Sequence, residues 1–296
     1  MRRPLRLGLE LPALGVPATS AGGSVAGSLD ACRAAVAAAE DAGFDAVWLA
    51  DRPGPAASVA DAVTLAGGLA DAAGTLTVGV IADVVDARHP AVLARDLTCL
   101  DVVSGGRAAL LLHDSDPTRP APDEPGPADA LGRLGEASAI CRSQLSHAGS
   151  VASAHYFRFG QVNDRPRPVQ PGGPGIVVQL GPAAERGVEP VRGARSGAGG
   201  LVACLRSADA VVTGGSIEQV RSARDLIDVT CSEAGLGTVP ALLWRGVLPA
   251  TSRNGEAALT RRVLSSAGVD GVIVGLARSG PPRPDEVGRL ARWGTG

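Results

Sequence analysis

The sequence predicts an α/β fold, specifically a (β/α)8 TIM barrel with an insertion after its fourth strand. The first observation is size, because 296 residues with 45% hydrophobic side chains suit one domain of barrel dimensions. The second is that short apolar runs alternate with helical stretches along most of the chain. Strands separated by helices pair in parallel through right-handed crossovers, and about eight such units fit this length. We expect one barrel domain over residues 1–296, with a lid or insertion at about 114–174.

The most regular unit lies in residues 88–112, where a loop, a helix, a tight turn and a buried strand follow one another. Pro90 suits a first helical turn, where the backbone N–H is not needed. Apolar residues then recur at helical spacing and predict one stripe, made of Val92, Leu93, Leu97, Leu100 and Val103. Gly105 and Gly106 end the helix, because glycine adopts the left-handed cap conformation at low cost. The continuous apolar run 108–112 is typical of a strand covered on both faces.

The chain before this unit shows the same alternation. The alanine-rich stretch 30–42 predicts a helix that Gly43 ends, and a second helix is expected over 58–73. The apolar runs that predict strands here are 5–11, 44–50 and 76–81.

Beyond residue 113 the alternation stops and later resumes. Residues 114–130 are rich in proline and aspartate and predict a loop, a helix follows at 130–145, and 146–174 reads as irregular chain. The later strands are expected at 175–180, 209–213, 241–248 and 271–275. The later helices are expected at 196–207, 217–234, 255–267 and 284–293.

A doubly wound open sheet is the alternative fold. It would place a glycine-rich phosphate loop directly after the first strand. Gly22, Gly23 and Gly27 follow that strand at too great a distance and lack GxGxxG spacing. The barrel is therefore the favoured prediction.

Composition and charge argue against several classes of function. A net charge of −2 without a basic stripe disfavours nucleic-acid binding, and no apolar run approaches the ~18 residues of a membrane span. Arg6, Glu10 and Pro12 interrupt the N-terminal apolar run, so we expect a strand rather than a signal peptide, and a cytoplasmic protein. The five cysteines are scattered and the four histidines show no ligand spacing with them, which predicts reduced thiols and no metal site.

A (β/α)8 barrel builds its site at the C-terminal ends of its strands, and this rule selects candidates without further knowledge. They are Glu10, Asp51, Arg52, Ala82–Asp83, His113, Asp114, Gln179–Gly181, Thr213–Gly215 and Arg245. His113 has a side chain that titrates near neutral pH, so it could act as a general base or hydrogen-bond a cofactor. The alternatives are a loop histidine packed under the proline-rich segment and, for Asp51 and Arg52, an adjacent ion pair.

Two further features suit a cofactor site. Ser196–Gly200 opens a helix after a glycine-rich loop, near Arg192, Arg195 and Arg206, and a helix N-terminus holds phosphate well. A plain N-cap is the alternative for Ser196. The 115–174 region is long for a connection, which is typical of a water-excluding lid or of a proline-rich surface loop.

Six segments in order resemble the luciferase-like flavin monooxygenase superfamily. AAAEDAGFDAVWLAD (37–51), TLTVGV (75–80) and AGVDGVIVGL (267–276) resemble its second, third and last strands. HPAVLARDLTCLDVVSGGR (89–107) resembles its most specific signature. Residues 162–181 and 196–212 are similar to the branch that contains nitrilotriacetate and dibenzothiophene-sulfone monooxygenases.

This resemblance implies a barrel enzyme, usually dimeric, that uses reduced FMN with O2 or the deazaflavin F420 at the barrel mouth. The reduced FMN would come from a separate flavin reductase. The cofactor-binding residues it implies are Gly79, Val80 and Ile81 beside the ring, and Gly181, Arg195, Ser196 and Gly197 near the phosphate. The catalytic residues it implies are His113 at the reactive edge of the flavin, and Arg52 with Asp51 beside an anionic flavin or substrate.

The chain departs from the family pattern at several places, and residues 182–193 interrupt the usual strand-five turn between Gly181 and Ser196. Arg52 follows Asp51 where the family often has histidine, and Asp114 stands where luciferases carry a phosphate-binding arginine. The leading expectation is a monooxygenase that uses reduced FMN and O2 on a small organic substrate. The alternatives are an F420-dependent hydride-transfer enzyme and a non-catalytic flavin-binding or partner subunit. Either a homodimer or a heterodimer with a relative is expected.

Overall fold

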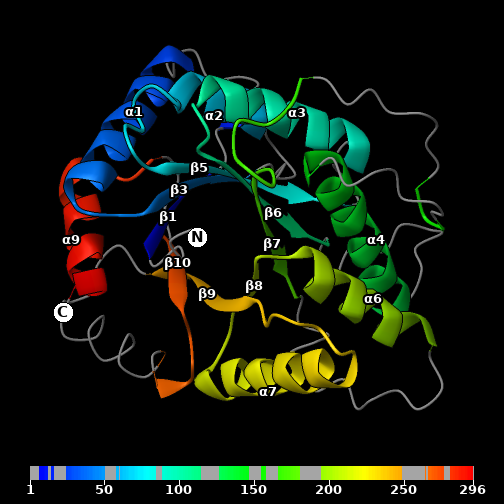
Figure 1. Ribbon diagram of the computed structural model, residues 1–296. Coiled ribbons are helices and arrows are strands. Elements are labelled where there is room, and N and C mark those ends of the chain that lie inside the picture. The colour runs from blue at the N-terminus through cyan, green and yellow to red at the C-terminus, as the bar shows by residue number, and fades with distance from the viewer. Residues whose placement is uncertain are drawn as a thin grey trace.

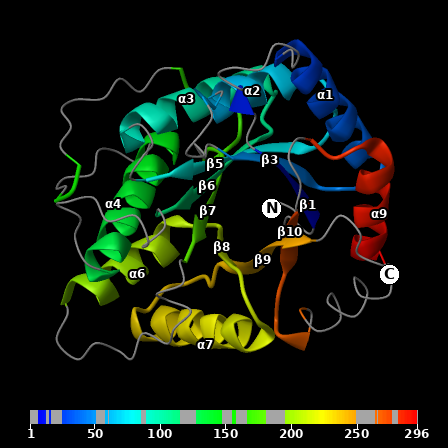
Figure 2. The ribbon, with the colours of Figure 1, turned by 180° about the vertical axis from the view of Figure 1, so that it is seen from behind.

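Parallel strands close into a barrel, and helices surround it (Figure 1, Figure 2). The structure is a computed structural model that describes residues 7–12, 15–16, 25–50, 58–59, 61–84, 89–114, 127–146, 155–157, 166–180, 195–248, 264, 266–276 and 281–295. Around the barrel the strands follow the order β1-β10-β9-β8-β7-β6-β5-β3. Their bounds are β1 Leu7–Leu11, β3 Ala46–Ala50, β5 Thr77–Asp83, β6 Ala108–His113, β7 Gly175–Gln179, β8 Ala210–Thr213, β9 Ala241–Leu248 and β10 Gly271–Leu276. The predicted (β/α)8 TIM barrel is confirmed.

The helices lie on the outside of the barrel. Their bounds are α1 Val25–Asp41, α2 Ala62–Leu69, α3 Pro90–Val103, α4 Pro127–Ser146, α6 Arg195–Ser207, α7 Ile217–Glu233 and α9 Pro284–Thr295. Two further short strands, β2 (Gly15–Val16) and β4 (Ser58–Val59), pair with each other in antiparallel fashion. Among the helices in the described part of the chain, none is long and apolar enough to cross a membrane.

Most predicted elements agree with the observed ones to within a few residues. The predicted helix over 58–73 is wrong at both ends, because 58–59 belong to β4 and α2 ends at Leu69. Asp61 sets the start of α2, since its carboxylate accepts the backbone N–H of Thr64 at 2.9 Å as an N-cap. The predicted helix 255–267 lies mostly outside the described residues.

The signature helix α3 has the predicted ends but a different buried face. His89 is the N-cap, and Gly105 and Gly106 adopt φ values of +67° and +85° after the helix. Val92 and Val103 were expected in the buried stripe, and this is wrong, because they are 49% and 67% exposed. The buried residues of α3 are Pro90, Ala91, Leu93, Ala94, Leu97, Thr98, Leu100 and Asp101.

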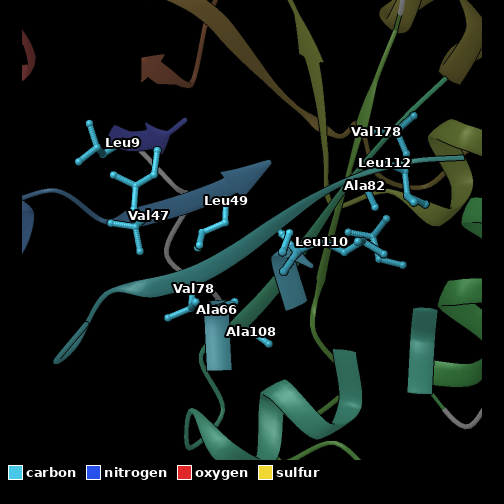
Figure 3. Close-up of a cluster of buried hydrophobic side chains, with 14 of the residues drawn as sticks. Leu9, Val47, Leu49, Ala66, Val78, Ala82, Ala108, Leu110, Leu112 and Val178 are labelled. Atoms are coloured by element: carbon cyan, nitrogen blue, oxygen red, sulfur yellow. The ribbon is translucent and has the colours of Figure 1, made fainter. Parts of the chain in front are cut away.

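The core has two parts, because successive strand residues point to opposite faces. Residues that point outward pack under the helices and include those in Figure 3, such as Val47, Val78 and Leu110. Residues that point inward fill the barrel, and Trp48 is the largest of them. A Cβ at Gly79 would lie 2.2 Å from the Trp48 ring, and one at Gly8 2.7 Å from Nε1, so both positions need glycine. The barrel is therefore filled below its mouth.

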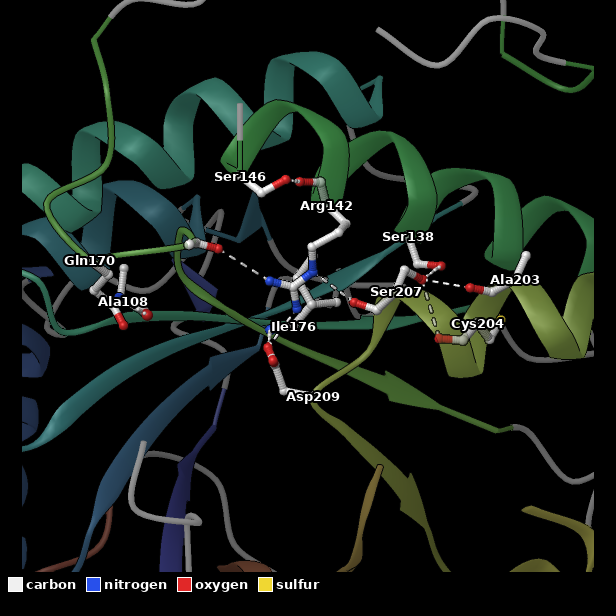
Figure 4. Close-up of polar contacts among 11 residues, drawn as sticks. Ala108, Ser138, Arg142, Ser146, Gln170, Ile176, Ala203, Cys204, Ser207 and Asp209 are labelled. Carbon is white, nitrogen blue, oxygen red and sulfur yellow. Dashed lines mark hydrogen bonds and ion pairs between the residues drawn. The ribbon is translucent and has the colours of Figure 1, made fainter. Parts of the chain in front are cut away.

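Aspartates secure the N-terminal ends of the barrel strands. Asp45, Asp209 and Asp270 each directly precede a strand, and their carboxylates accept the N–H groups of Leu7, Ile176 and Leu242 in the neighbouring strands, at 2.7 to 3.0 Å. The Asp209 carboxylate also pairs with Arg142 of α4, as Figure 4 shows. These contacts lie at the end of the barrel opposite the mouth, which suits a role in stability.

The 114–174 region contains a helix of the barrel wall. Within it, α4 packs directly along α6, where a Cβ at Gly200 would lie 2.5 Å from the carbonyl oxygen of Leu131. Glu136 of α4 accepts, through its carboxylate, the backbone N–H groups of residues 155–157, which follow the helix, at 2.6 to 2.9 Å. A lid could thus involve only the rest of this region, and that role stays a prediction.

Candidate active site at the barrel mouth

Polar side chains line the inside of the barrel at the C-terminal ends of its strands. They are Glu10 on β1, Asp83 on β5, His113 on β6, Gln179 on β7 and Arg245 on β9. Each lies two residues after an inward position of its strand, so it shares the inner face. All of them were selected from the sequence by the strand-end rule, although Glu10, Asp83 and His113, which were expected after their strands, lie within them.

Arg245 links three strands across the mouth. Its Nε and Nη2 donate to the two Glu10 oxygens at 2.7 and 2.5 Å, and its Nη1 donates to Gln179 Oε1 at 2.7 Å. The Arg245 and Glu10 side chains are only 19% and 14% exposed. A bidentate pair of this kind fixes both groups in direction, and removing one partner of a buried pair costs about 3–5 kcal/mol.

His113 and Asp83 form the second polar pair of the mouth. The two residues are direct partners in the β5–β6 ladder, and His113 Nδ1 lies 3.9 Å from Asp83 Oδ2. Their side chains are 12% and 9% exposed. The pair of Leu112 with Val178 places His113 and Gln179 next to each other on β6 and β7. The two polar pairs therefore form one continuous arc.

Asp114, which breaks the family pattern, is neutralised in this structure. Arg133 of α4 donates to both Asp114 oxygens at 3.2 and 3.0 Å, in a pair that is nearly buried. Asp114 lies close enough to α6 for its charge to contribute to the raised pKa of Cys204, which burial chiefly lifts to about 12. The sequence reasoning missed Arg133, because the only available signal was an arginine on a helix 19 residues away.

The residues predicted to contact a cofactor fall in different places. Gly79 packs against Trp48, Ile81 lies in the barrel interior, and the Val80 side chain points outward under the helices. Any contact of Val80 with a ring at the mouth would therefore use its backbone. Of the phosphate residues, Arg195, Ser196 and Gly197 form the first turn of α6, as the sequence predicts. Asp51, Arg52 and Gly181 lie outside the described residues.

The sequence of the chain matches one family over most of its length. The model of the luciferase-like monooxygenase family matches residues 13–285. The chain belongs to the luciferase-like monooxygenase family. The predicted resemblance is thereby confirmed over most of the chain. A search of curated protein sequences finds no significant match.

Solved structures of this fold cover almost the whole chain. The monooxygenase RslO1 from Streptomyces bottropensis is 19% identical, with a TM-score of 0.69 over 97% of this chain and 96% of that one. The coenzyme F420-dependent tetrahydromethanopterin reductase from Methanopyrus kandleri is 17% identical, with a TM-score of 0.68 over 97% of both chains. The EDTA monooxygenase EmoA from Chelativorans sp. BNC1 is 18% identical, with a TM-score of 0.59 over 91% of this chain and 67% of that one. These similarities establish the fold.

Proposed function

We propose that this luciferase-like chain is a flavin-dependent monooxygenase that uses reduced FMN and O2 to oxygenate a small organic substrate. Family membership supports an oxidoreductase, and RslO1 and EmoA are monooxygenases with the same fold. The observation that carries the proposal is the His113–Asp83 pair, held at the mouth above an apolar barrel interior. The reduced FMN would be supplied by a separate flavin reductase.

The residues present fit a flavin phosphate at the start of α6. A helix N-terminus offers unpaired N–H groups and the positive end of the helix dipole. The carboxylate of Asp114 would repel a phosphate, but its pairing with Arg133 at 3.0 Å removes most of that cost. When bound, the flavin supplies the electron and oxygen chemistry.

The chain's own residues would then position the reactants and exclude water. His113 is held beside Asp83, so it can donate or accept a proton at the reactive edge of the site. Below it, Leu111 and Trp48 are fully buried and close the barrel to solvent. Arg245, fixed by Glu10, would orient a polar group on the other side of the mouth.

F420-dependent hydride transfer is the second candidate, because two similar structures are F420-dependent enzymes. F420 carries a long anionic tail that suits a groove lined with arginines, whereas FMN needs one compact phosphate pocket. Arg133 is already committed to Asp114, which favours FMN. A flavin-binding subunit without turnover is the remaining alternative.

A cofactor titration of the purified protein tests these candidates. Binding of FMN, anaerobically reduced FMN and F420 is followed by absorbance and fluorescence. Tight binding of reduced FMN alone supports the monooxygenase, and preferential binding of F420 moves the reaction to hydride transfer. If neither cofactor binds at concentrations of tens of micromolar, the enzyme proposal fails.

The role of His113 predicts a separable effect on turnover. We expect His113→Gln to lower kcat by about 100-fold while cofactor affinity changes little, because a positioned acid or base typically contributes 10²–10⁴. The measurement is steady-state turnover alongside the cofactor titration. His155→Gln is the matched control, since His155 is exposed. Equal kcat values for the two variants would remove His113 from the chemistry.

A further inference from the structure

The Arg245 network leaves hydrogen-bond donors unused at the barrel mouth. A guanidinium carries five N–H groups, and the contacts with Glu10 and Gln179 engage three of them. Gln179 accepts through Oε1, and its amide nitrogen carries two more N–H groups. Within the part of the chain that the structure describes, these remaining N–H groups have no protein acceptor. The mouth therefore offers a set of fixed donors on β7 and β9.

The charge of this network determines which acceptor suits it. Glu10 receives both of its hydrogen bonds from Arg245, so the guanidinium charge is already compensated. A carboxylate added beside a neutral and mostly buried pair would leave one uncompensated negative charge. A neutral acceptor, such as a carbonyl oxygen, would pair with the free donors without that cost.

Small residues line the inner surface beside the network. Gly275 of β10 faces Glu10 and carries no side chain, and a Cβ placed there would still lie 3.6 Å from the Glu10 Cβ. On β3, the neighbouring inward position is Ala50. His113 follows Gln179 around the barrel, so a group held by Gln179 would lie beside the His113–Asp83 pair.

We propose that Arg245 and Gln179 form a subsite for a neutral carbonyl oxygen of the substrate, with Glu10 as the positioning residue. The luciferase-like enzyme would thus take small ketones, amides or esters rather than carboxylates. This inference rests on the proposed function, since it names the substrate class of the same mouth. A carbonyl of the flavin ring has the same chemistry, so the test must separate the two sources.

The test measures binding by NMR and does not require turnover. The 15N-labelled protein is titrated with N-methylacetamide as the neutral carbonyl probe and with acetate as the anionic probe. The side-chain NH2 signal of Gln179 is assigned by its loss in Gln179→Glu. We expect N-methylacetamide to shift this signal saturably, and acetate to bind at least tenfold more weakly.

Substitutions test the donors and the charge separately. Gln179→Glu keeps the acceptor for Arg245 but replaces the free donors by an oxygen, so affinity for N-methylacetamide should fall about tenfold. Because the reporter NH2 is lost in this variant, its affinity is followed by the backbone N–H signals of β7, which are also recorded for the unsubstituted protein. Gln219→Glu is the matched control, because Gln219 also accepts through Oε1 but lies on the surface in a helix cap.

In Glu10→Gln the guanidinium charge of Arg245 is uncompensated, so acetate should bind more tightly than N-methylacetamide. A purely structural role for Glu10 would not reverse that order.

Addition of FMN before the probe shows whether the subsite binds a carbonyl of the substrate or a carbonyl of the flavin ring. If the probe still shifts Gln179 with reduced FMN bound, the subsite belongs to the substrate. If FMN shifts the same signal and displaces the probe, the flavin occupies the subsite and the substrate assignment is overturned. A lack of FMN binding would contradict the proposed function alone, because probe binding is measured independently. Tighter binding of acetate to the unsubstituted protein, or an unchanged affinity in Gln179→Glu, would overturn the carbonyl subsite.

Discussion

At the scale of single residues, Glu40 shows how one carboxylate orders a turn. Near the end of α1, it accepts the backbone N–H of Thr75 at 2.7 Å and its hydroxyl at 2.9 Å. Gly74 adopts a φ of +50° beside it, where any side chain would collide with the carboxylate. The backbone hydrogen bond from Thr75, and secondly its hydroxyl, lower the pKa of Glu40 from its usual 4.5.

This pKa shift predicts a dependence of stability on acid. Because the pKa of Glu40 is lowered in the folded state, its contribution is present above the unfolded value of 4.5 and is lost as pH falls through the folded value. We expect Glu40→Gln to be less stable than the unsubstituted protein at neutral pH, with the difference shrinking below pH 4.5. Thermal melts across this range measure it. Glu233→Gln, at the exposed end of α7, is the control for the loss of one surface charge.

At the scale of elements, close packing of α4 on α6 depends on the absence of one Cβ. Gly200 on α6 faces the backbone of Leu131 and Gly132, and a Cβ there would lie 2.5 to 2.6 Å from their atoms. Gly199, the preceding residue on the same helix, is exposed and has nothing within 4 Å of a Cβ. A substitution at Gly199 therefore changes helix propensity alone, whereas the same substitution at Gly200 also changes the packing of α6 on α4.

The two glycines predict opposite effects of the same substitution. Gly200→Ala should destabilise the protein by about 1–3 kcal/mol, because the helices must move apart. Gly199→Ala should stabilise it by about 0.5–1 kcal/mol, since alanine favours a helix. Chemical unfolding of both variants measures the difference. Similar effects for the two variants would contradict the close contact between α4 and α6.

Elements were largely predictable from the sequence, while contacts between elements were not. The order of apolar runs and glycine caps gives β5, α3 and β6 nearly to the residue. In the sequence, Asp101 is recognisable only as a polar residue within the signature helix, and its contacts are not. It is fully buried and accepts the backbone N–H groups of Val169 and Gln170 at 2.7 and 3.0 Å. No periodicity indicates such a partner 68 residues away.

At the scale of the whole molecule, the residues of the candidate site could be predicted from the sequence, but the contacts between them could not. The strand-end rule selected Glu10, Asp83, His113, Gln179 and Arg245, because strand ends in a parallel barrel meet at one mouth. The rule could not pair Arg245 with Glu10, 235 residues away, since the register of a closed barrel decides which side chains meet. It also could not find Arg133, which reaches the mouth from a helix.

The outer face of α3 determines what we expect of the assembly. Val92, Val102 and Val103 are 49%, 46% and 67% exposed, and Cys99 lies among them and is exposed too. Arg95 lies between Val92 and Cys99 and is exposed as well, so the apolar part of this face is Cys99, Val102 and Val103, and we propose this part as an interface. In a symmetric homodimer the same face would meet itself about a twofold axis, which brings the two Cys99 thiols near each other. We propose a second copy of the chain as the partner on α3, with a relative of the chain as the alternative.

This interface predicts that Val103→Glu converts a dimer into a monomer, because two buried carboxylates would face each other across the axis. Light scattering after size exclusion measures the mass. Val229→Glu is the matched control, since Val229 is 54% exposed on α7, and it should leave the dimer intact.

Mild oxidation should also link two chains through Cys99, whereas burial keeps the pKa of the Cys141 and Cys204 thiols at about 12 and makes them unreactive. A monomeric unsubstituted protein, or a Val103→Glu variant that stays dimeric, would show that α3 is not the interface.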